Sequence, residues 1–211
     1  MYKRQAVESG VARRPIIDLN RYARDLSGRL DPTAGALDAI MEQVRANPRQ
    51  VVFAEGEEEK VVRAAVAYRN AGYGRPVLIG REDRVLATLA SLGLGKMDGI
   101  DIHNARLSSA NPKYTDFLYE RLQRKGFLRR DVQRMVNQDR NVFAACMVAT
   151  GDADAMVTGL TRSTSVCLED VGQAIGSRPG HISFGLTLLF GPHGRTFFLA
   201  DSLVHLSLIH I

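Results

Sequence analysis

Residues 155–165, with the sequence AMVTGLTRSTS, carry the side chains best suited to chemistry. An apolar strand passes there through Gly159 into a hydroxyl-rich helix start. The backbone N–H groups and positive dipole end of a helix N-terminus favour an anion such as phosphate. Gly159 would let the ligand approach the backbone, and Arg162 would add a positive charge. We therefore predict a ligand site formed by Thr158, Gly159, Arg162, Ser163, Thr164 and Ser165.

The same segment also has a purely structural interpretation. Ser163 or Thr164 could simply cap the helix, because Ser and Thr are favoured at that position. The segment matches neither a Walker loop nor the GxGxxG fingerprint. The local pattern leaves both interpretations open.

Acidic residues follow a second apolar strand. The run from Glu55 to Glu59 would stand at the carboxyl end of this strand, where open α/β sheets bind ligands. Acids at a helix start also complement the helix dipole, and they would repel an anionic ligand. We favour the dipole interpretation for the three consecutive glutamates at 57–59. Asp152 and Asp154 have no partner that the sequence identifies, and we expect them to be turn residues after Gly151.

Several other functions find no support in the sequence. The histidines form no HExxH pair, and Cys146 and Cys167 lack the spaced partners of a zinc site, so we expect two reduced core thiols and no metal site. No GxSxG elbow is present. The formal net charge is +5, but Lys and Arg are interleaved with Asp and Glu, which argues against a nucleic-acid partner.

The chain also lacks the signals of membrane insertion and secretion. No uncharged apolar run reaches the length of a membrane span, and the basic N-terminus has no apolar segment behind it. We therefore expect a cytoplasmic protein without a membrane partner.

Strands and helices alternate along the part of the chain that would position these residues. Continuous apolar strands separated by amphipathic helices predict an α/β fold, a three-layer parallel sheet with helices on both faces. The predicted strands are residues 50–54, 75–80, 98–103 and 155–158. The predicted helices are residues 34–45, 57–70, 82–92, 112–125, 129–137, 140–150 and 163–175.

Further along the chain the pattern changes. Residues 182–190 and 195–200 are predicted strands, and the GPHG sequence between them predicts a hairpin. We therefore divide the chain into a first subdomain at residues 34–178 and the start of a second at residues 179–205. Residues 6–33 are predicted to be a linker with one helix around residues 19–26.

The two ends of the chain have an unusual relationship. Residues 1–5, MYKRQ, can be encoded by DNA whose reverse complement encodes LSLIH, which is the sequence of residues 206–210. Such ends resemble a translated sequencing adapter. We therefore expect residues 1–5 and 206–211 to be adapter-derived, with the gene continuing beyond both.

Several stretches together resemble the phosphotransacetylase family. They are VFAEG at 52–56 with RAA at 63–65, RPVLIG at 75–80, GDADAMVTG at 151–159 and FFLAD at 197–201. The match runs in order over about residues 34–205. The preceding ESGVARRPI at 8–16 resembles the segment that leaves the catalytic module of multimodular NADP-dependent malic enzymes, which carry such a domain at the C-terminus.

The resemblance implies an isocitrate-dehydrogenase-like fold of two subdomains with a ligand cleft, the second incomplete here. Family enzymes move an acetyl group between CoA and phosphate. Their catalytic aspartate and arginine lie beyond this chain's end, so no catalytic residue is assigned. Where the family often has Arg-Pro, this chain has Glu169-Asp170, which removes a cation from a site for anions.

That departure resembles the malic enzyme relatives, whose domain is implied to bind acetyl-CoA as an allosteric inhibitor and to support homo-oligomerisation with little transferase activity. The upstream module would convert malate to pyruvate with NADP and a divalent metal, Mg or Mn. Two alternatives stay open. The domain could be an active phosphate acetyltransferase, or it could serve only dimerisation.

Overall fold

The computed structural model describes residues 32–94, 98–190 and 195–201, together with Val204 and Ile16, Asp18, Leu19, Tyr22, Ala23 and Leu26. The chain divides into two compact units, and the larger runs from Val44 to Ser183. The expected adapter-derived ends lie outside the described residues, as do most of the expected linker and its helix.

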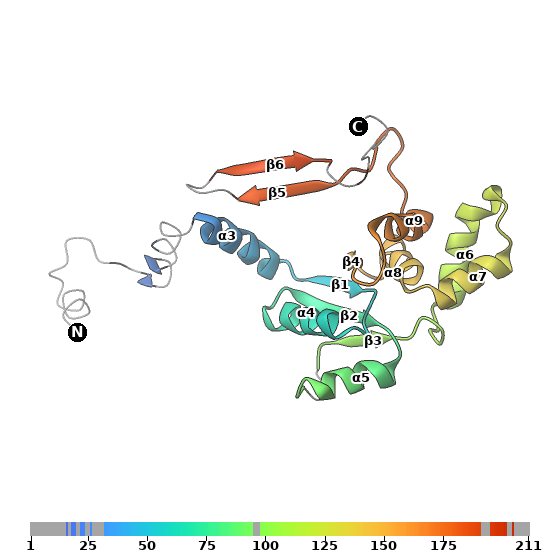
Figure 1. Ribbon diagram of the computed structural model, residues 1–211, viewed down its shortest axis with the longest axis horizontal. Helices are drawn as coiled ribbons and strands as arrows, with labels where there is room; N and C mark the ends of the chain where they lie inside the picture. Colours follow the sequence, from blue (N-terminus) through green and yellow to red (C-terminus); the bar gives the residue numbers. More distant parts are fainter. Residues whose placement is uncertain are drawn as a thin grey trace. The chain divides into compact units, whose positions relative to one another are not determined.

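A parallel sheet forms the centre of the larger unit (Figure 1). Its strands are β1 (Arg49–Phe53), β2 (Gly74–Ile79), β3 (Asp101–His103) and β4 (Ala155–Val157), in the order β3-β2-β1-β4. The four predicted strands are therefore present and parallel. The strand β3 is shorter than predicted, because Gly99 just before it has a φ of 82°, which interrupts the extended backbone.

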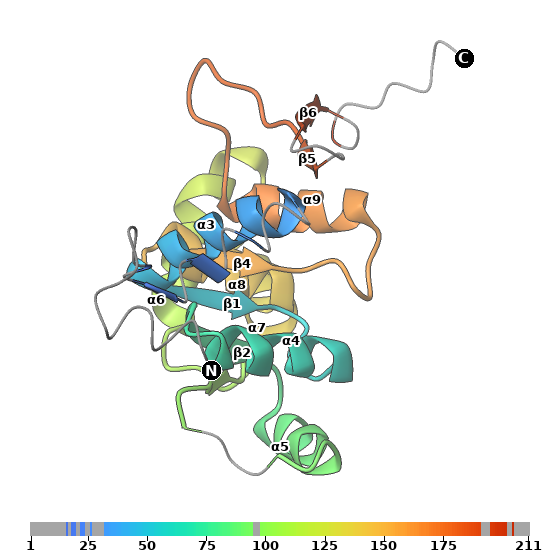
Figure 2. The same cartoon turned by 90° about the vertical axis from the view of Figure 1, so that its left-hand side faces the viewer.

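Helices cover both faces of this sheet (Figure 2). Side chains of β2 alternate between the faces: Val77 and Ile79 pack into one core cluster, and Leu78 packs into the other. The cluster around Leu78 includes α4 and α5, and the cluster on the opposite face includes α6, α7, α8 and α9. The helix bounds are α4 (Glu59–Asn70), α5 (Glu82–Ser91), α6 (Asn111–Leu122), α7 (Arg129–Gln138), α8 (Arg140–Ala149) and α9 (Thr164–Ala174). The predicted three-layer α/β fold is confirmed.

The helix α8 is buried along most of its length, from Asn141 to Met147. Its sequence is apolar from Val142 to Ala149, as expected for a helix in the middle of a core. The helix ends shortly before Gly151, whose φ of 80° lies in the left-handed region. This glycine stop was predicted, and it turns the chain into β4.

The smaller unit contains the helix α3 (Pro32–Ala46) over most of its length and a hairpin. The strand β5 (Leu186–Phe190) pairs antiparallel with β6 (Thr196–Ala200), from Leu186 opposite Ala200 to Phe190 opposite Thr196. The predicted hairpin is confirmed. Its first strand begins four residues later than predicted, because β6 ends at Ala200 and the Asp201 carboxylate accepts the Gly185 N–H at 3.2 Å.

Within the described residues, we find no helix that combines the length and apolar character needed to cross a membrane.

Candidate functional site

The loops that follow the strands gather at the carboxyl edge of the sheet. Backbone hydrogen bonds continue past the strand ends, from Ala54 N to Val157 O, from Gly56 N to Ile79 O and from Gly80 N to His103 O, each at 3.0 Å. They hold the loops after all four strands side by side. This is the edge at which open α/β sheets bind ligands.

Gly56 allows the first two of these loops to approach closely. A Cβ atom at this position would lie 2.8 Å from the Leu78 Cβ and 2.9 Å from both the N and the O of Ile79. Two of these neighbours are backbone atoms of a central strand, which cannot move aside easily. Only glycine fits here.

Glu55 fills the turn after β4 with its own carboxylate. Its Oε2 accepts the N–H groups of Gly159 at 3.1 Å and Leu160 at 2.7 Å, and its Oε1 accepts the N–H of Thr161 at 2.7 Å. The Thr161 hydroxyl donates to the same Oε1 at 2.5 Å. Three backbone N–H groups of the turn predicted to bind an anion, those just before Arg162, therefore already donate to the Glu55 carboxylate.

These bonds require the Glu55 carboxylate to be ionised. The side chain is 5% exposed, and burial alone would raise its pKa. Hydrogen bonds from the Thr161 hydroxyl and from the three N–H groups outweigh burial and lower the pKa below its ordinary value. Glu55 is therefore a buried carboxylate that accepts hydrogen bonds from the β4 turn, a role that the sequence pattern did not predict.

Arg162 faces two carboxylates. Its Nη1 lies 2.6 Å from the Asp139 Oδ2 and 2.6 Å from the Asp170 Oδ2. Its pKa is raised, first by the hydrogen bond to Asp139, against a smaller opposing effect of burial, and further by Asp170. Asp139 and Asp170 thus neutralise the one cation of the predicted turn.

Asn141 links this ion pair to the end of β4. Its amide Nδ2 donates to the Asp170 Oδ2 at 3.1 Å, and its Oδ1 accepts the Thr158 hydroxyl at 2.7 Å. Asn141 is 2% exposed, so these bonds are shielded from solvent. Thr158 and Arg162 are joined by one network that runs from the buried Asn141 to the exposed Arg162.

The start of α9 has a different character. Ser163 occupies the N-cap position but makes no capping hydrogen bond with its side chain. Its hydroxyl lies 3.2 Å from the Ser165 hydroxyl instead. The N–H groups of Thr164, Ser165 and Val166 have no acceptor among the described residues. Capping by Ser163 is not observed, and ligand binding at this turn stays a prediction.

Other acidic residues also have partners that the sequence pattern did not reveal. Glu57 pairs with Arg81 and Arg84, each at 3.3 Å. Asp152 and Asp154 lie in the turn after Gly151, as predicted, but both also have partners. Asp152 accepts hydrogen bonds from Lys113, Tyr114 and Thr150, and Asp154 accepts from Arg49 and from the Gln50 N–H, at distances between 2.6 and 3.2 Å.

Two of these partners carried a signal in the sequence. Asp139 directly precedes α8 and accepts the Asn141 and Val142 N–H groups at 2.8 and 3.2 Å, the pattern of an N-cap. Glu55 stands just after a strand, where buried carboxylates can reach neighbouring loops. Asn141 and Asp170 lie inside apolar and mixed helices, and no local pattern distinguishes them.

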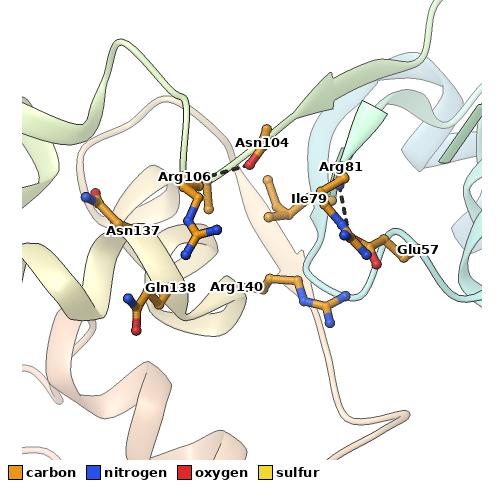
Figure 3. Close-up of a pocket in the computed structure, with 10 residues that line it drawn as sticks. Glu57, Ile79, Arg81, Asn104, Arg106, Asn137, Gln138 and Arg140 are labelled. Carbon is orange, nitrogen blue, oxygen red and sulfur yellow. Dashed lines mark hydrogen bonds and ion pairs between the residues drawn. The ribbon is translucent and has the colours of Figure 1, made fainter. Parts of the chain in front are cut away.

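A cavity of about 380 Å³ lies at the same edge, beside β2 and β3 (Figure 3). It is lined by Glu57, Ile79, Gly80, Arg81, Asn104, Ala105, Arg106, Asn137, Gln138 and Arg140. None of these belongs to the predicted turn.

The two cysteines are free and buried, as expected. Burial raises the pKa of the Cys146 thiol to about 12, although Arg121 acts in the opposite direction. Over the described ranges, His, Cys, Asp and Glu form no group of three or more that could hold a metal ion.

Comparison with known proteins supports the resemblance. The family described as phosphate acetyl/butaryl transferase matches residues 36–207. An NADP-dependent malic enzyme of Rhizobium meliloti is 53% identical over 95% of this chain and 26% of its own length. A probable NADP-dependent malic enzyme of Rickettsia prowazekii is 44% identical over 87% of this chain and 24% of its own length. The chain thus spans about a quarter of these relatives.

The fold agrees with this match. The crystal structure of a phosphotransacetylase from Streptococcus pyogenes superimposes with a TM-score of 0.70 and 27% identity, over 77% of this chain and 49% of that one. Sequence and fold therefore agree that the chain belongs to the phosphate acetyl/butaryl transferase family.

Proposed function

We propose that this chain is the phosphotransacetylase-like domain of an NADP-dependent malic enzyme, and that it binds acetyl-CoA as an allosteric inhibitor and supports homo-oligomerisation. The upstream module would oxidise and decarboxylate malate with NADP and Mg or Mn. The 53% identity to a malic enzyme over 95% of the chain supports the parent protein. Acetyl-CoA would bind at the turn formed by Thr158, Gly159, Arg162, Ser163, Thr164 and Ser165.

The neutralised Arg162 is the observation that favours regulation over transfer. Acetyl transfer to phosphate develops negative charge on a tetrahedral oxygen, and preorganised cations or N–H donors stabilise it. Here Asp139 and Asp170 form ion pairs with Arg162 and neutralise its charge. The Glu55 carboxylate accepts hydrogen bonds from three N–H groups of the turn. The N–H groups that start α9 are left for a ligand, which suits binding better than catalysis.

Three measurements on the full-length protein test this proposal. Calorimetry should show acetyl-CoA binding, acetyl-CoA should slow malate-dependent NADPH formation, and acetyl phosphate should not accumulate from acetyl-CoA and phosphate. Binding without inhibition would contradict the regulatory role. No binding at all would favour a domain that serves only dimerisation.

An active phosphate acetyltransferase is the second candidate, because the Streptococcus pyogenes structure with the same fold is a phosphotransacetylase. Robust formation of acetyl phosphate by the full-length protein would establish this activity and overturn the proposal. A heat-inactivated sample and a reaction without phosphate serve as controls.

A further inference from the structure

Asp139 is the single residue between α7 and α8, and its carboxylate serves two neighbours at once. One oxygen, Oδ1, accepts the N–H groups of Asn141 at 2.8 Å and Val142 at 3.2 Å in the first turn of α8. The other oxygen, Oδ2, lies 2.6 Å from the Arg162 Nη1. One side chain therefore attaches the start of α8 to the turn proposed to bind acetyl-CoA.

Arg162 stands between two carboxylates that belong to different helices. Its Nη1 contacts Asp139 at the start of α8 and Asp170 in α9, at 2.6 Å each. Because both oxygens contact the same nitrogen atom, the two carboxylates lie close together and would repel each other without the cation. Among the residues that the structure describes, neither carboxylate pairs with another cation. Arg162 is therefore the charge that holds the start of α8 against α9.

Asn141 adds an uncharged link at the same place. Its Nδ2 donates to the Asp170 Oδ2 at 3.1 Å, and this oxygen also contacts Arg162. Asn141 is 2% exposed, so the surroundings are shielded from water and the repulsion between the carboxylates is stronger than at the surface. A single amide N–H cannot balance two negative charges. The link through Asn141 does not replace the cation.

A ligand in the turn can reach Arg162 more easily than it can reach the carboxylates. The Arg162 side chain is 37% exposed, whereas the side chains of Asp139 and Asp170 are 22% and 16% exposed. Acetyl-CoA carries phosphate groups, and guanidinium groups bind phosphate through charge-assisted hydrogen bonds. Acetyl-CoA in the turn therefore competes with the two carboxylates for Arg162.

We infer that acetyl-CoA draws Arg162 away from Asp139 and Asp170, and that the repulsion left between these carboxylates loosens the start of α8. The junction of α7 and α8 then changes when the turn is occupied. A ligand can shift such an equilibrium only through interactions that differ between the two states, and the competition for Arg162 supplies that difference. The inference rests on the proposed function and names how occupancy of the turn is transmitted to the helices.

Hydrogen exchange of the full-length protein, followed by mass spectrometry, tests the role of the charges without ligand. Arg162→Ala removes the cation, so the N–H groups of residues 141–143 should exchange about fivefold faster. Adding Asp170→Asn to this variant removes one of the two repelling charges and should return the rate toward that of the wild type. Arg63→Ala is the control, because it breaks an ion pair with Glu59 in α4.

The same measurement with saturating acetyl-CoA tests the transmission. In the wild type, exchange should slow at residues 163–166, where the ligand covers N–H groups, and should become about fivefold faster at residues 141–143. Asp139→Asn keeps an oxygen that can cap α8 but removes the charge, since Asn and Asp are equally good N-caps. This variant should bind acetyl-CoA without a change at residues 141–143. Asp83→Asn in α5 should behave like the wild type.

Unchanged exchange at residues 141–143 in ligand-free Arg162→Ala would overturn the inference. So would acetyl-CoA binding that leaves these residues unchanged in the wild type, or that accelerates them equally in Asp139→Asn. Asp170→Asn should also abolish the acceleration, which keeps the test decisive if Asp139→Asn impairs folding. Calorimetry on the same samples separates the two proposals. No binding of acetyl-CoA would overturn the proposed function and the inference with it, whereas binding without faster exchange would overturn the inference alone.

Discussion

Two hydrogen bonds join Glu55 to Thr161, which lies 106 positions further along the chain. The Glu55 Oε1 accepts the Thr161 backbone N–H at 2.7 Å and the Thr161 hydroxyl at 2.5 Å. One carboxylate after β1 thereby determines the path of the backbone after β4. The position of α9, which begins three residues later, depends on this contact.

Replacing Glu55 by glutamine should loosen the turn after β4. The glutamine side chain would place its NH2 group, a donor, opposite backbone N–H groups that are also donors. Because some of these hydrogen bonds would be lost, we expect a loss of about 2–3 kcal/mol of local stability. Hydrogen exchange of the full-length protein, followed by mass spectrometry, should show faster exchange at residues 159–161. Glu58→Gln is the matched control, because Glu58 makes no capping hydrogen bond with its side chain. Equal exchange in both variants would contradict the role of Glu55.

The contribution of Glu55 should depend on pH in a definite direction. Its folded pKa is lowered, so its stabilisation is fully present above the unfolded value of about 4.3 and is lost as the pH falls through the folded pKa. The difference in exchange between wild type and Glu55→Gln should be large near neutral pH and should shrink under acidic conditions. A difference that does not change with pH would show that the carboxylate charge is irrelevant.

Gly56→Ala should be destabilising, because the new methyl group would press on Leu78 and on the backbone of Ile79. The expected cost is about 1–3 kcal/mol, as for other overpacked sites. Gly172→Ala in α9 is the matched control. It has no atom within 4 Å of the new Cβ and should stabilise the helix by up to about 1 kcal/mol. Thermal unfolding of both variants measures the contrast, and a neutral Gly56→Ala would refute the close packing.

Arg162→Ala should weaken acetyl-CoA binding by about tenfold in the full-length protein if the turn is the ligand site. Asp170→Asn should have the opposite effect, because it leaves Arg162 with a single carboxylate partner. Asp83→Asn makes the same change at an exposed position in α5, away from the turn, and serves as the control. Calorimetric titration measures all three affinities. Unchanged affinity in Arg162→Ala would leave this arginine with a structural role alone.

The buried thiols should be inert in the native protein. Burial raises the pKa of Cys146 to about 12, and thiols react as thiolates. Iodoacetamide near neutral pH should therefore leave Cys146 and Cys167 unlabelled, whereas both should be labelled in guanidinium chloride. Peptide mass spectrometry reads out each residue separately. Rapid native labelling of Cys146 would show that its surroundings open easily.

Much of the fold was predictable because it is encoded locally. Apolar runs such as residues 50–54 and 75–80 can be buried on both faces only in a covered parallel sheet, and glycines such as Gly151 mark helix ends by their freedom at positive φ. The hairpin of β5 and β6 was also predictable, because the GPHG sequence between its strands is a local signal for a turn.

The site was less predictable because its partners are distant in the sequence. Glu55 and Glu57 resemble ordinary acids at a helix start, and only the packing of β1 between β2 and β4 brings Glu55 to the turn and Glu57 to Arg81. The sequence pattern predicted Arg162 as the cation of the turn, but its partners Asp139 and Asp170 come from the N-cap of α8 and from α9.

The sequence by itself determined the fold class, the family and the place of a hydroxyl-rich turn at the carboxyl edge of the sheet. Only the tertiary structure decided which charges meet there: Glu55 occupies the N–H groups of the turn, Asp139 and Asp170 neutralise Arg162, and Arg106 and Arg140 are left facing a cavity. The physical reason is that secondary structure follows from local patterns, whereas electrostatic pairing depends on distances that arise only when remote segments pack together.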